Sequence, residues 1–208
     1  INKNYKNKTY IIGFPRNDFI VYKNREMGKD IKKNTKILIC GGSQGAVNLN
    51  LKIIEIFKKF PVNILRNMHV SIQCQKEQKS YLEKILKSLD IDSEIVLYYD
   101  NFTNKLQKTD LLISRAGAGT INDIVFTQIP TIFVPFPYAA DDHQITNAEF
   151  LVKENAAKII LEDDLLLNYN VNEIKNLIVL SSEREILIQN LKKIKNNKSN
   201  DLLYEHTL

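Results

Sequence analysis

The chain has little cysteine, with two residues among 208. Cys40 and Cys74 each stand at the end of a predicted strand, a position typical of buried, reduced thiols in a cytosolic protein. Two thiols are too few for a disulfide framework and do not form a zinc-binding pattern. His143 has no histidine or carboxylate at metal-ligand spacing. We therefore expect no metal, and no other cofactor.

Long apolar runs are also absent. No stretch approaches the roughly 18 apolar residues of a membrane-spanning helix. The first ten residues are rich in Asn and Lys and lack the apolar segment of a signal peptide. Because the chain begins with Ile1 instead of Met, we expect it to be a fragment of a longer protein.

Arginine is scarce: only five of the 29 cationic residues are Arg, in a chain of net charge +5. The clustered arginines and groove-reading motifs of nucleic-acid-binding proteins are missing, so we expect no nucleic-acid partner. Scattered lysines still permit contact with an anionic lipid surface. Hydrophobic residues make up 44% of the chain and charged residues 25%, which is typical of a globular protein and excludes disorder throughout.

Short apolar runs alternate with amphipathic segments. Strands are predicted at 36–40, 68–74, 94–98, 110–114, 131–134 and 157–161. Helices are predicted at 46–60, 76–89, 102–107, 120–127, 144–154, 172–180 and 183–195. This alternation predicts an α/β protein with a doubly wound parallel sheet, covered by helices on both faces. Polar residues 1–35 predict a linker or the remnant of a preceding domain, and 36–208 form the α/β domain with its C-terminal helices.

The first predicted strand is followed by a glycine-rich loop, 41–46, of sequence Gly-Gly-Ser-Gln-Gly-Ala. In such sheets, ligands bind at the carboxyl ends of the strands. Glycines let the backbone approach a ligand closely, and the start of the next helix attracts phosphate. A plain tight turn is the alternative. Dinucleotide and Walker loops are excluded, because neither G-x-G-x-x-G nor G-K-[ST] occurs in this loop.

The same loop matches the G-x-S-x-G nucleophile elbow of serine hydrolases. In that alternative, Ser43 is the nucleophile, His143 the base, and Asp110 or Asp123 the acid.

The loop after the fourth predicted strand reads Ser-Arg-Ala-Gly-Ala-Gly-Thr and ends at Thr120. A second glycine-rich helix start suits a ligand with a diphosphate, which the amides of Ala118, Gly119 and Thr120 would cradle. The Thr120 hydroxyl caps the helix or donates to an oxygen. Asp123 either completes a capping box with Thr120 or accepts hydrogen bonds from a ribose diol. Arg115 either neutralises phosphate or forms a structural ion pair.

Two further loops carry polar and aromatic residues. Following a proline-rich turn, His143, Gln144 and Asn147 can bond to hydroxyls, and the amides suit sugars because each offers a donor and an acceptor. Asp141 or Asp142 in the same stretch instead caps the helix. After the third predicted strand, the aromatic residues Tyr98, Tyr99 and Phe102 either pack in the core or stack on a flat base, with backbone groups reading the base edge.

Together, these loops resemble the MurG family of peptidoglycan transferases. The stretches that carry the resemblance are 41–46, 114–120 and 135–144 followed by Asn147-Ala148. The similarity runs from about Gly13 to the C-terminus and covers the family's second half. It implies a Rossmann-like fold, the C-terminal donor-nucleotide domain of a two-domain GT-B glycosyltransferase.

The resemblance implies contacts with UDP-GlcNAc at Arg16, Ser43, Tyr98, Tyr99, Phe102, Ala118, Gly119, Thr120, Asp123, His143, Gln144 and Asn147. Ser43 would face the diphosphate, and the Tyr99 backbone would read the uracil. Asp123 replaces the family's usual Glu and is one methylene shorter. Arg16 belongs to Gly13-Phe-Pro-Arg16, which is one residue shorter than the family's Gly-Asn-Pro-Val-Arg.

The implied reaction is inverting and metal-independent. It transfers GlcNAc from UDP-GlcNAc to undecaprenyl-diphospho-muramoyl-pentapeptide, at the cytoplasmic face of the bacterial membrane, by a peripheral protein. The family's acceptor-handling, His-bearing loop does not occur in this sequence, so the catalytic residues are expected outside it and we expect no catalysis by this chain alone. The alternative is a non-catalytic nucleotide-sugar-binding module or one half of a split enzyme.

Overall fold

The computed structural model describes residues 34–41, 46–137 and 143–194. One parallel sheet has the strand order β3-β2-β1-β4-β5-β6. Its strands are β1 (Thr35–Cys40), β2 (Met68–Gln73), β3 (Asp92–Val96), β4 (Leu111–Ser114), β5 (Thr131–Phe133) and β6 (Lys158–Ile159). The predicted doubly wound parallel sheet is confirmed. The linker predicted at the start of the chain lies almost wholly outside the described residues and stays a prediction.

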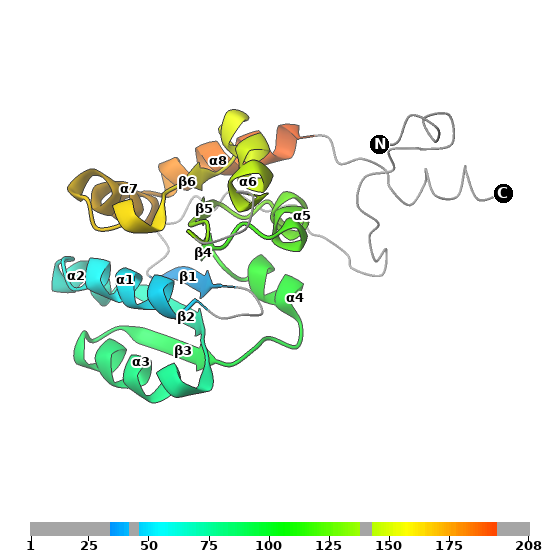
Figure 1. The fold of residues 1–208 in the computed structure, drawn as a ribbon. Coiled ribbons are helices and arrows are strands. Elements are labelled where there is room, and N and C mark those ends of the chain that lie inside the picture. The colour runs from blue at the N-terminus through cyan, green and yellow to red at the C-terminus, as the bar shows by residue number, and fades with distance from the viewer. Residues whose placement is uncertain (1–33, 42–45, 138–142, 195–208) are drawn as a thin grey trace, which may run out of the picture.

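Helices cover both faces of the sheet (Figure 1). They are α1 (Val47–Phe57), α2 (Val62–Leu65), α3 (Lys76–Ser88), α4 (Phe102–Gln107), α5 (Ala118–Thr127), α6 (His143–Lys153), α7 (Asn168–Val179) and α8 (Ser181–Lys193), with a 3-10 helix at Glu162–Asp164. In Figure 1, α1, α3 and α7 lie on one side of the sheet, and α4, α5 and α6 lie on the other. The helix predicted at 46–60 is α1, which ends at Phe57, and the short helix α2, which begins after Pro61, was not predicted.

Each face of the central strand β1 packs into a different part of the core. Ile37 and Ile39 join the cluster built with α1, α3 and α7, whereas Leu38 and Cys40 join the cluster built with α4, α5 and α6. All four side chains are buried. Full burial of one aliphatic side chain stabilises a protein by about 1.5–3 kcal/mol, so this strand anchors the sheet from both sides.

The outer strands depart from this pattern. On β2, Val70 and its apolar neighbours pack toward α3, while His69 and Ser71 point to the opposite face. There His69 Nδ1 lies 2.8 Å from Asp92 Oδ2, and Ser71 Oγ donates to Glu94 Oε2 at 3.1 Å. The sheet is therefore apolar on both faces at its centre, whereas this face of β2 and β3 is polar.

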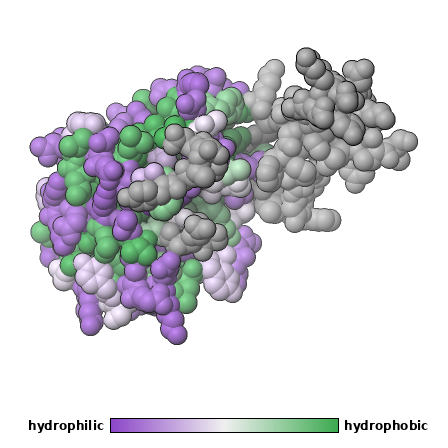
Figure 2. Space-filling view, in the orientation of Figure 1, coloured by the Kyte–Doolittle hydropathy of each residue, from purple (hydrophilic) through white to green (hydrophobic). Residues whose placement is uncertain are grey.

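Apolar and hydrophilic side chains are mixed on the face of the molecule in Figure 2. Within residues 34–41, 46–137 and 143–194, the helices are too short or too polar for any of them to cross a bilayer.

Candidate functional site

The carboxyl ends of β1 and β4 meet at the centre of the sheet. Cys40 and Ser114, the last residues of the two strands, are register partners, and the Arg115 N–H donates to the Cys40 carbonyl at 3.3 Å. From β1 the chain continues outward through β2 and β3, and from β4 it continues the other way through β5 and β6. The glycine-rich loops after β1 and β4 therefore leave side by side at a topological switch point, where α/β sheets bind ligands.

Helix α5 begins at this point with free amide groups. Its N-cap, Gly117, supplies no side-chain cap, and the Ile121 N–H makes the first bond of the helix, to the Gly117 carbonyl at 3.1 Å. Among the described residues, the N–H groups of Ala118, Gly119 and Thr120 have no backbone or side-chain acceptor. A Cβ at Gly119 would meet no atom of the described residues within 4 Å, so this first turn is not packed against a neighbour at Gly119. Free amides at the positive end of a helix make an anion-binding site.

The predicted capping box is wrong. Since α5 begins at Ala118, Thr120 is already inside the helix and does not cap it, and Asp123 lies one turn further along. The Asp123 carboxylate is half-buried, and it makes no hydrogen bond or ion pair with another described residue. Burial raises the pKa of Asp123. A shielded carboxylate without a donor is unfavourable, so this group is available to accept hydrogen bonds from ligand hydroxyls.

Arg115 forms a structural ion pair, which is one of the two roles that the sequence left open for it. Its side chain is 8% exposed and pairs through Nη2 with the Glu162 carboxylate. Nη1 donates to the carbonyls of Val134 at 3.0 Å and Pro135 at 2.9 Å, and the guanidinium lies 5.3 Å from the Phe136 ring centroid. Arg115 therefore joins the ends of β4 and β5 to the 3-10 helix, and the phosphate-neutralising role is wrong.

Helix α6 is tied to the loops that follow β4 and β5 by two predicted site residues. Gln144 Oε1 accepts the Phe136 N–H at 2.9 Å, and Asn147 Nδ2 donates to the Ala116 carbonyl at 3.1 Å. Gln144 Nε2 and Asn147 Oδ1 have no partner among the described residues, so each amide keeps one group for a ligand. His143 is the first residue of α6, and nothing further about it, Asp141 or Asp142 falls within the described part of the chain.

The aromatic residues after β3 divide into two groups. Tyr98 is 68% exposed, whereas the Tyr99 ring packs against the core near Phe102, with its hydroxyl buried. Burial raises the pKa of Tyr99. The N–H and C=O of Tyr99 make no hydrogen bond with another described residue. The loop thus presents an exposed ring and a free peptide at the carboxyl edge of the sheet.

The first residue of the loop after β1 must be a glycine for a steric reason. A Cβ on Gly41 would lie 2.0 Å from Ala46 Cβ and 2.6 Å from Ala46 N. Such a contact forces the two ends of the loop apart, so glycine is required here. Ser43 itself lies outside the described residues, as does Arg16.

Asn50 is a buried polar residue that the sequence analysis missed. From α1 it donates to the Gln73 carbonyl at 3.4 Å and to Gln78 Oε1 at 3.3 Å, and Gln78 Nε2 reaches the Val47 carbonyl at 3.2 Å. This network ties the first turn of α1, which follows the glycine loop, to β2 and α3. An asparagine among the apolar residues of the helix was the available signal.

One of the two acids of the proposed hydrolase triad is in the wrong place. Asp110 precedes β4, and its Oδ2 accepts the Lys36 N–H at 2.9 Å, at the amino end of the sheet. Ser43 follows the carboxyl end of β1. Strands rise about 3.3 Å per residue, so the length of β1 separates Asp110 from that loop. Asp110 as the acid is therefore wrong, while Asp123 and His143 stay untested in that role.

Neither cysteine forms a disulfide, and both are buried. Burial raises the pKa of the Cys40 thiol to about 12, so this thiol is protonated and unreactive. Within the described part of the chain, His, Cys, Asp and Glu side chains nowhere gather in a group of three or more that could hold a metal ion.

Residues 36–206 match the family model described as glycosyltransferase family 28 C-terminal domain. A Rickettsia bellii protein, named UDP-N-acetylglucosamine–N-acetylmuramyl-(pentapeptide) pyrophosphoryl-undecaprenol N-acetylglucosamine transferase, is 36% identical over 171 residues, which are 77% of this chain and 46% of that protein. A protein of the same name from Wolbachia sp. subsp. Brugia malayi is 31% identical over 165 residues, 79% of this chain and 48% of that one. The chain thus spans about half the length of these relatives.

Among solved structures, the crystal structure of Acinetobacter baumannii MurG superposes with a TM-score of 0.72 at 23% identity, covering 92% of this chain and 57% of that one. The UDP-GlcNAc 2-epimerase from Neisseria meningitidis, bound to UDP-GlcNAc, gives a TM-score of 0.56 at 15% identity and covers 86% of this chain and 45% of that one. These likenesses show the fold, that of the C-terminal domain of GT-B glycosyltransferases.

Proposed function

This chain belongs to the glycosyltransferase family 28 C-terminal domain family, and from that premise we propose that it is the donor-binding half of an N-acetylglucosaminyltransferase that uses UDP-GlcNAc. The acceptor is the lipid-linked muramoyl pentapeptide that the relatives' names contain. Since the chain spans about half of those relatives, the acceptor would be held by a further segment or a partner chain.

One observation carries the proposal: α5 begins with free amides beside the loop that leaves β1. The amides of Ala118, Gly119 and Thr120 would bind the pyrophosphate through the positive end of the helix. Ser43, in the loop that follows β1 in the sequence, would contact the same group. Because Arg115 is bonded to Glu162, the helix start supplies the positive potential here.

The remaining contacts follow the shape of a nucleotide sugar. The Asp123 carboxylate would accept hydrogen bonds from the ribose hydroxyls, and the free Tyr99 peptide would read the uracil edge beside Tyr98 and Phe102. Arg16 would lie on the uracil side. Gln144 Nε2 and Asn147 Oδ1 would bind the GlcNAc hydroxyls, with His143 next to them. Both amides are held by a first bond to the backbone, which fixes the direction of the group left for the ligand.

The chemistry assigned to this half is leaving-group stabilisation. The 4-hydroxyl oxygen of the muramoyl acceptor attacks the anomeric carbon of GlcNAc from the side opposite the diphosphate. The bond from that carbon to the β-phosphate oxygen breaks, UDP leaves with the electron pair, and the configuration inverts. A base outside this chain takes the hydroxyl proton. The amides are in position before the reaction, and their hydrogen bonds to the diphosphate strengthen as negative charge builds on it. The leaving group would therefore be stabilised without a metal.

A lipid-linked acceptor places the enzyme at the membrane surface. We infer that it is a peripheral protein of the cytoplasmic face, where the scattered lysines would meet anionic lipid.

Calorimetric titration of the chain with UDP-GlcNAc, UDP and uridine tests donor binding. We expect UDP to bind more tightly than uridine, because uridine lacks the groups that the α5 amides hold. Equal affinities would contradict the assignment of α5. A transfer assay with and without an added acceptor-binding half from a relative then separates the donor half of an enzyme from a non-catalytic binding module.

A further inference from the structure

A charged contact links β3 to α4 beneath the loop after β3. Lys105 Nζ, on α4, pairs with the Glu94 carboxylate on β3. The same carboxylate accepts the Ser71 hydroxyl at 3.1 Å. The Lys105 side chain is 19% exposed, so its ammonium is largely shielded from water. The Lys105 hydrogen bond lowers the pKa of Glu94, which keeps this counter-ion charged.

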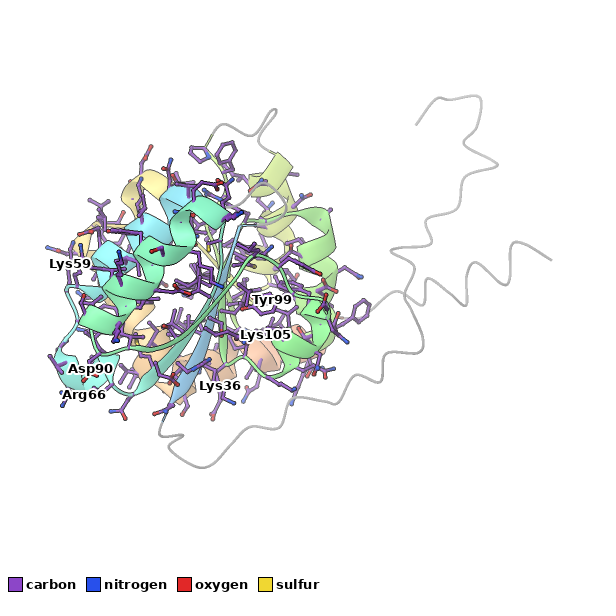
Figure 3. The ribbon with its side chains drawn as sticks, turned by 90° about the horizontal axis from the view of Figure 1, so that it is seen from below. Lys36, Lys59, Arg66, Asp90, Tyr99 and Lys105 are labelled. Atoms are coloured by element: carbon purple, nitrogen blue, oxygen red, sulfur yellow. The ribbon has the colours of Figure 1, made fainter. Side chains whose placement is uncertain are left out.

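The same ammonium lies over an aromatic ring. Lys105 Nζ is 5.2 Å from the Tyr99 ring centroid, and Figure 3 shows the two residues together at the sheet. The Phe102 ring lies beside Tyr99, at 6.5 Å between centroids. The buried Tyr99 hydroxyl has no hydrogen-bond partner among the described residues. The ring therefore packs against the cation and the neighbouring ring, and its hydroxyl lies near Ser71.

The position of this ring controls the direction of its own peptide. Tyr99 lies between the end of β3 and Asn101, whose Oδ1 caps α4 by accepting the Asn104 N–H at 2.9 Å. Between these anchors, the backbone groups of Tyr98, Tyr99 and Asp100 have no backbone hydrogen bond with other described residues. The Tyr99 ring is thus the internal anchor of the loop, and a ring that moves takes the peptide with it.

We propose that Lys105 is a positioning residue for base recognition: with Glu94 as its counter-ion, it holds the Tyr99 ring and so aims the Tyr99 peptide at the base of the donor nucleotide. The inference rests on the proposed function and deepens it. Lys105 acts through Tyr99 and does not touch the nucleotide. A cation over a shielded aromatic ring is attracted to its face, and this attraction helps to hold the ring in place.

The test is calorimetric titration of the whole chain and its variants with UDP and with ADP. ADP keeps the diphosphate and ribose and changes the base. We expect Lys105→Met to lower the affinity for UDP about tenfold and to leave the weaker affinity for ADP unchanged, so that the preference for uracil falls. Lys105→Arg retains a cation over the ring and should keep most of the preference. Lys108→Met, one turn further along and exposed, is the matched control and should change neither affinity.

Each other result overturns part of the account. Unchanged UDP affinity in Lys105→Met, or an equal loss for UDP and ADP, overturns the positioning role and leaves the proposed function standing. Failure of the unmodified chain to bind UDP overturns the proposed function, and the inference with it. If Lys105→Met does not fold, Glu94→Gln takes its place: a lowered preference for UDP over ADP supports the role, and an unchanged preference rejects it.

Discussion

Arg115 and Glu162 form a buried ion pair across 47 residues of sequence, joining the end of β4 to the 3-10 helix after β6. Their side chains are 8% and 3% exposed. The pair holds the carboxyl edge of the sheet, where the candidate phosphate site lies, against the 3-10 helix. Its loss should therefore lower the stability of the whole domain.

We expect Glu162→Gln to lower the free energy of unfolding by about 3–5 kcal/mol, because it leaves a buried guanidinium without its counter-charge. Urea denaturation followed by circular dichroism measures this change. The exposed pair of Glu55 and Lys58 provides the control, since surface pairs contribute little. If Glu162→Gln lowered the free energy of unfolding no more than Glu55→Gln does, the pair would not stabilise this edge of the sheet.

Gly119→Ala should separate ligand binding from folding. The added Cβ meets no atom of the described residues within 4 Å, so the free energy of unfolding should stay within about 1 kcal/mol of the unmodified protein. The methyl group would lie in the first turn of α5, beside the free amides, and should weaken UDP binding. Thermal unfolding and calorimetry measure the two effects. Full UDP affinity in a folded Gly119→Ala variant would place the diphosphate elsewhere.

Asp123 should make the free energy of unfolding depend on pH in the absence of ligand. Because burial raises its folded-state pKa, the ionised carboxylate destabilises the free protein at neutral pH, and this penalty disappears as the pH falls below the ordinary Asp pKa of about 3.9. Asp123→Asn should therefore raise the free energy of unfolding at pH 7, with a smaller gain at low pH, as urea titrations would record.

The same Asp123→Asn variant should bind UDP less tightly at pH 7, since a charged acceptor for the ribose hydroxyls is lost. Stabilisation together with weaker binding is the pattern of a functional carboxylate. Lower stability at pH 7 would show that the carboxylate has a structural partner.

Gln144→Ala should weaken UDP-GlcNAc binding by about 1–3 kcal/mol, from loss of a sugar contact and of the bond that holds the Phe136 amide. UDP, which lacks the sugar, should lose less. Competition titrations with the two ligands measure the difference. Glu149→Gln alters an exposed ion pair on the same helix and should leave both affinities unchanged. Equal losses for UDP and UDP-GlcNAc would remove Gln144 from the sugar pocket.

The sheet and the loops that border the site could be predicted from the sequence, because apolar strands such as Leu111–Ser114 and the glycines after them are local signals. The capping box failed because α5 starts two residues earlier than predicted, at Ala118. Glu162 could not be assigned to Arg115, nor Lys105 to Tyr99, because such partners are brought together by tertiary packing and leave no mark in local spacing.

The most direct measurement is a crystal structure of the chain with UDP-GlcNAc bound. The account predicts β-phosphate oxygens within hydrogen-bond distance of the amides of Ala118, Gly119 and Thr120, between the loops that leave β1 and β4. Nucleotide density anywhere else on the protein, or a diphosphate that makes no contact with the start of α5, would contradict it.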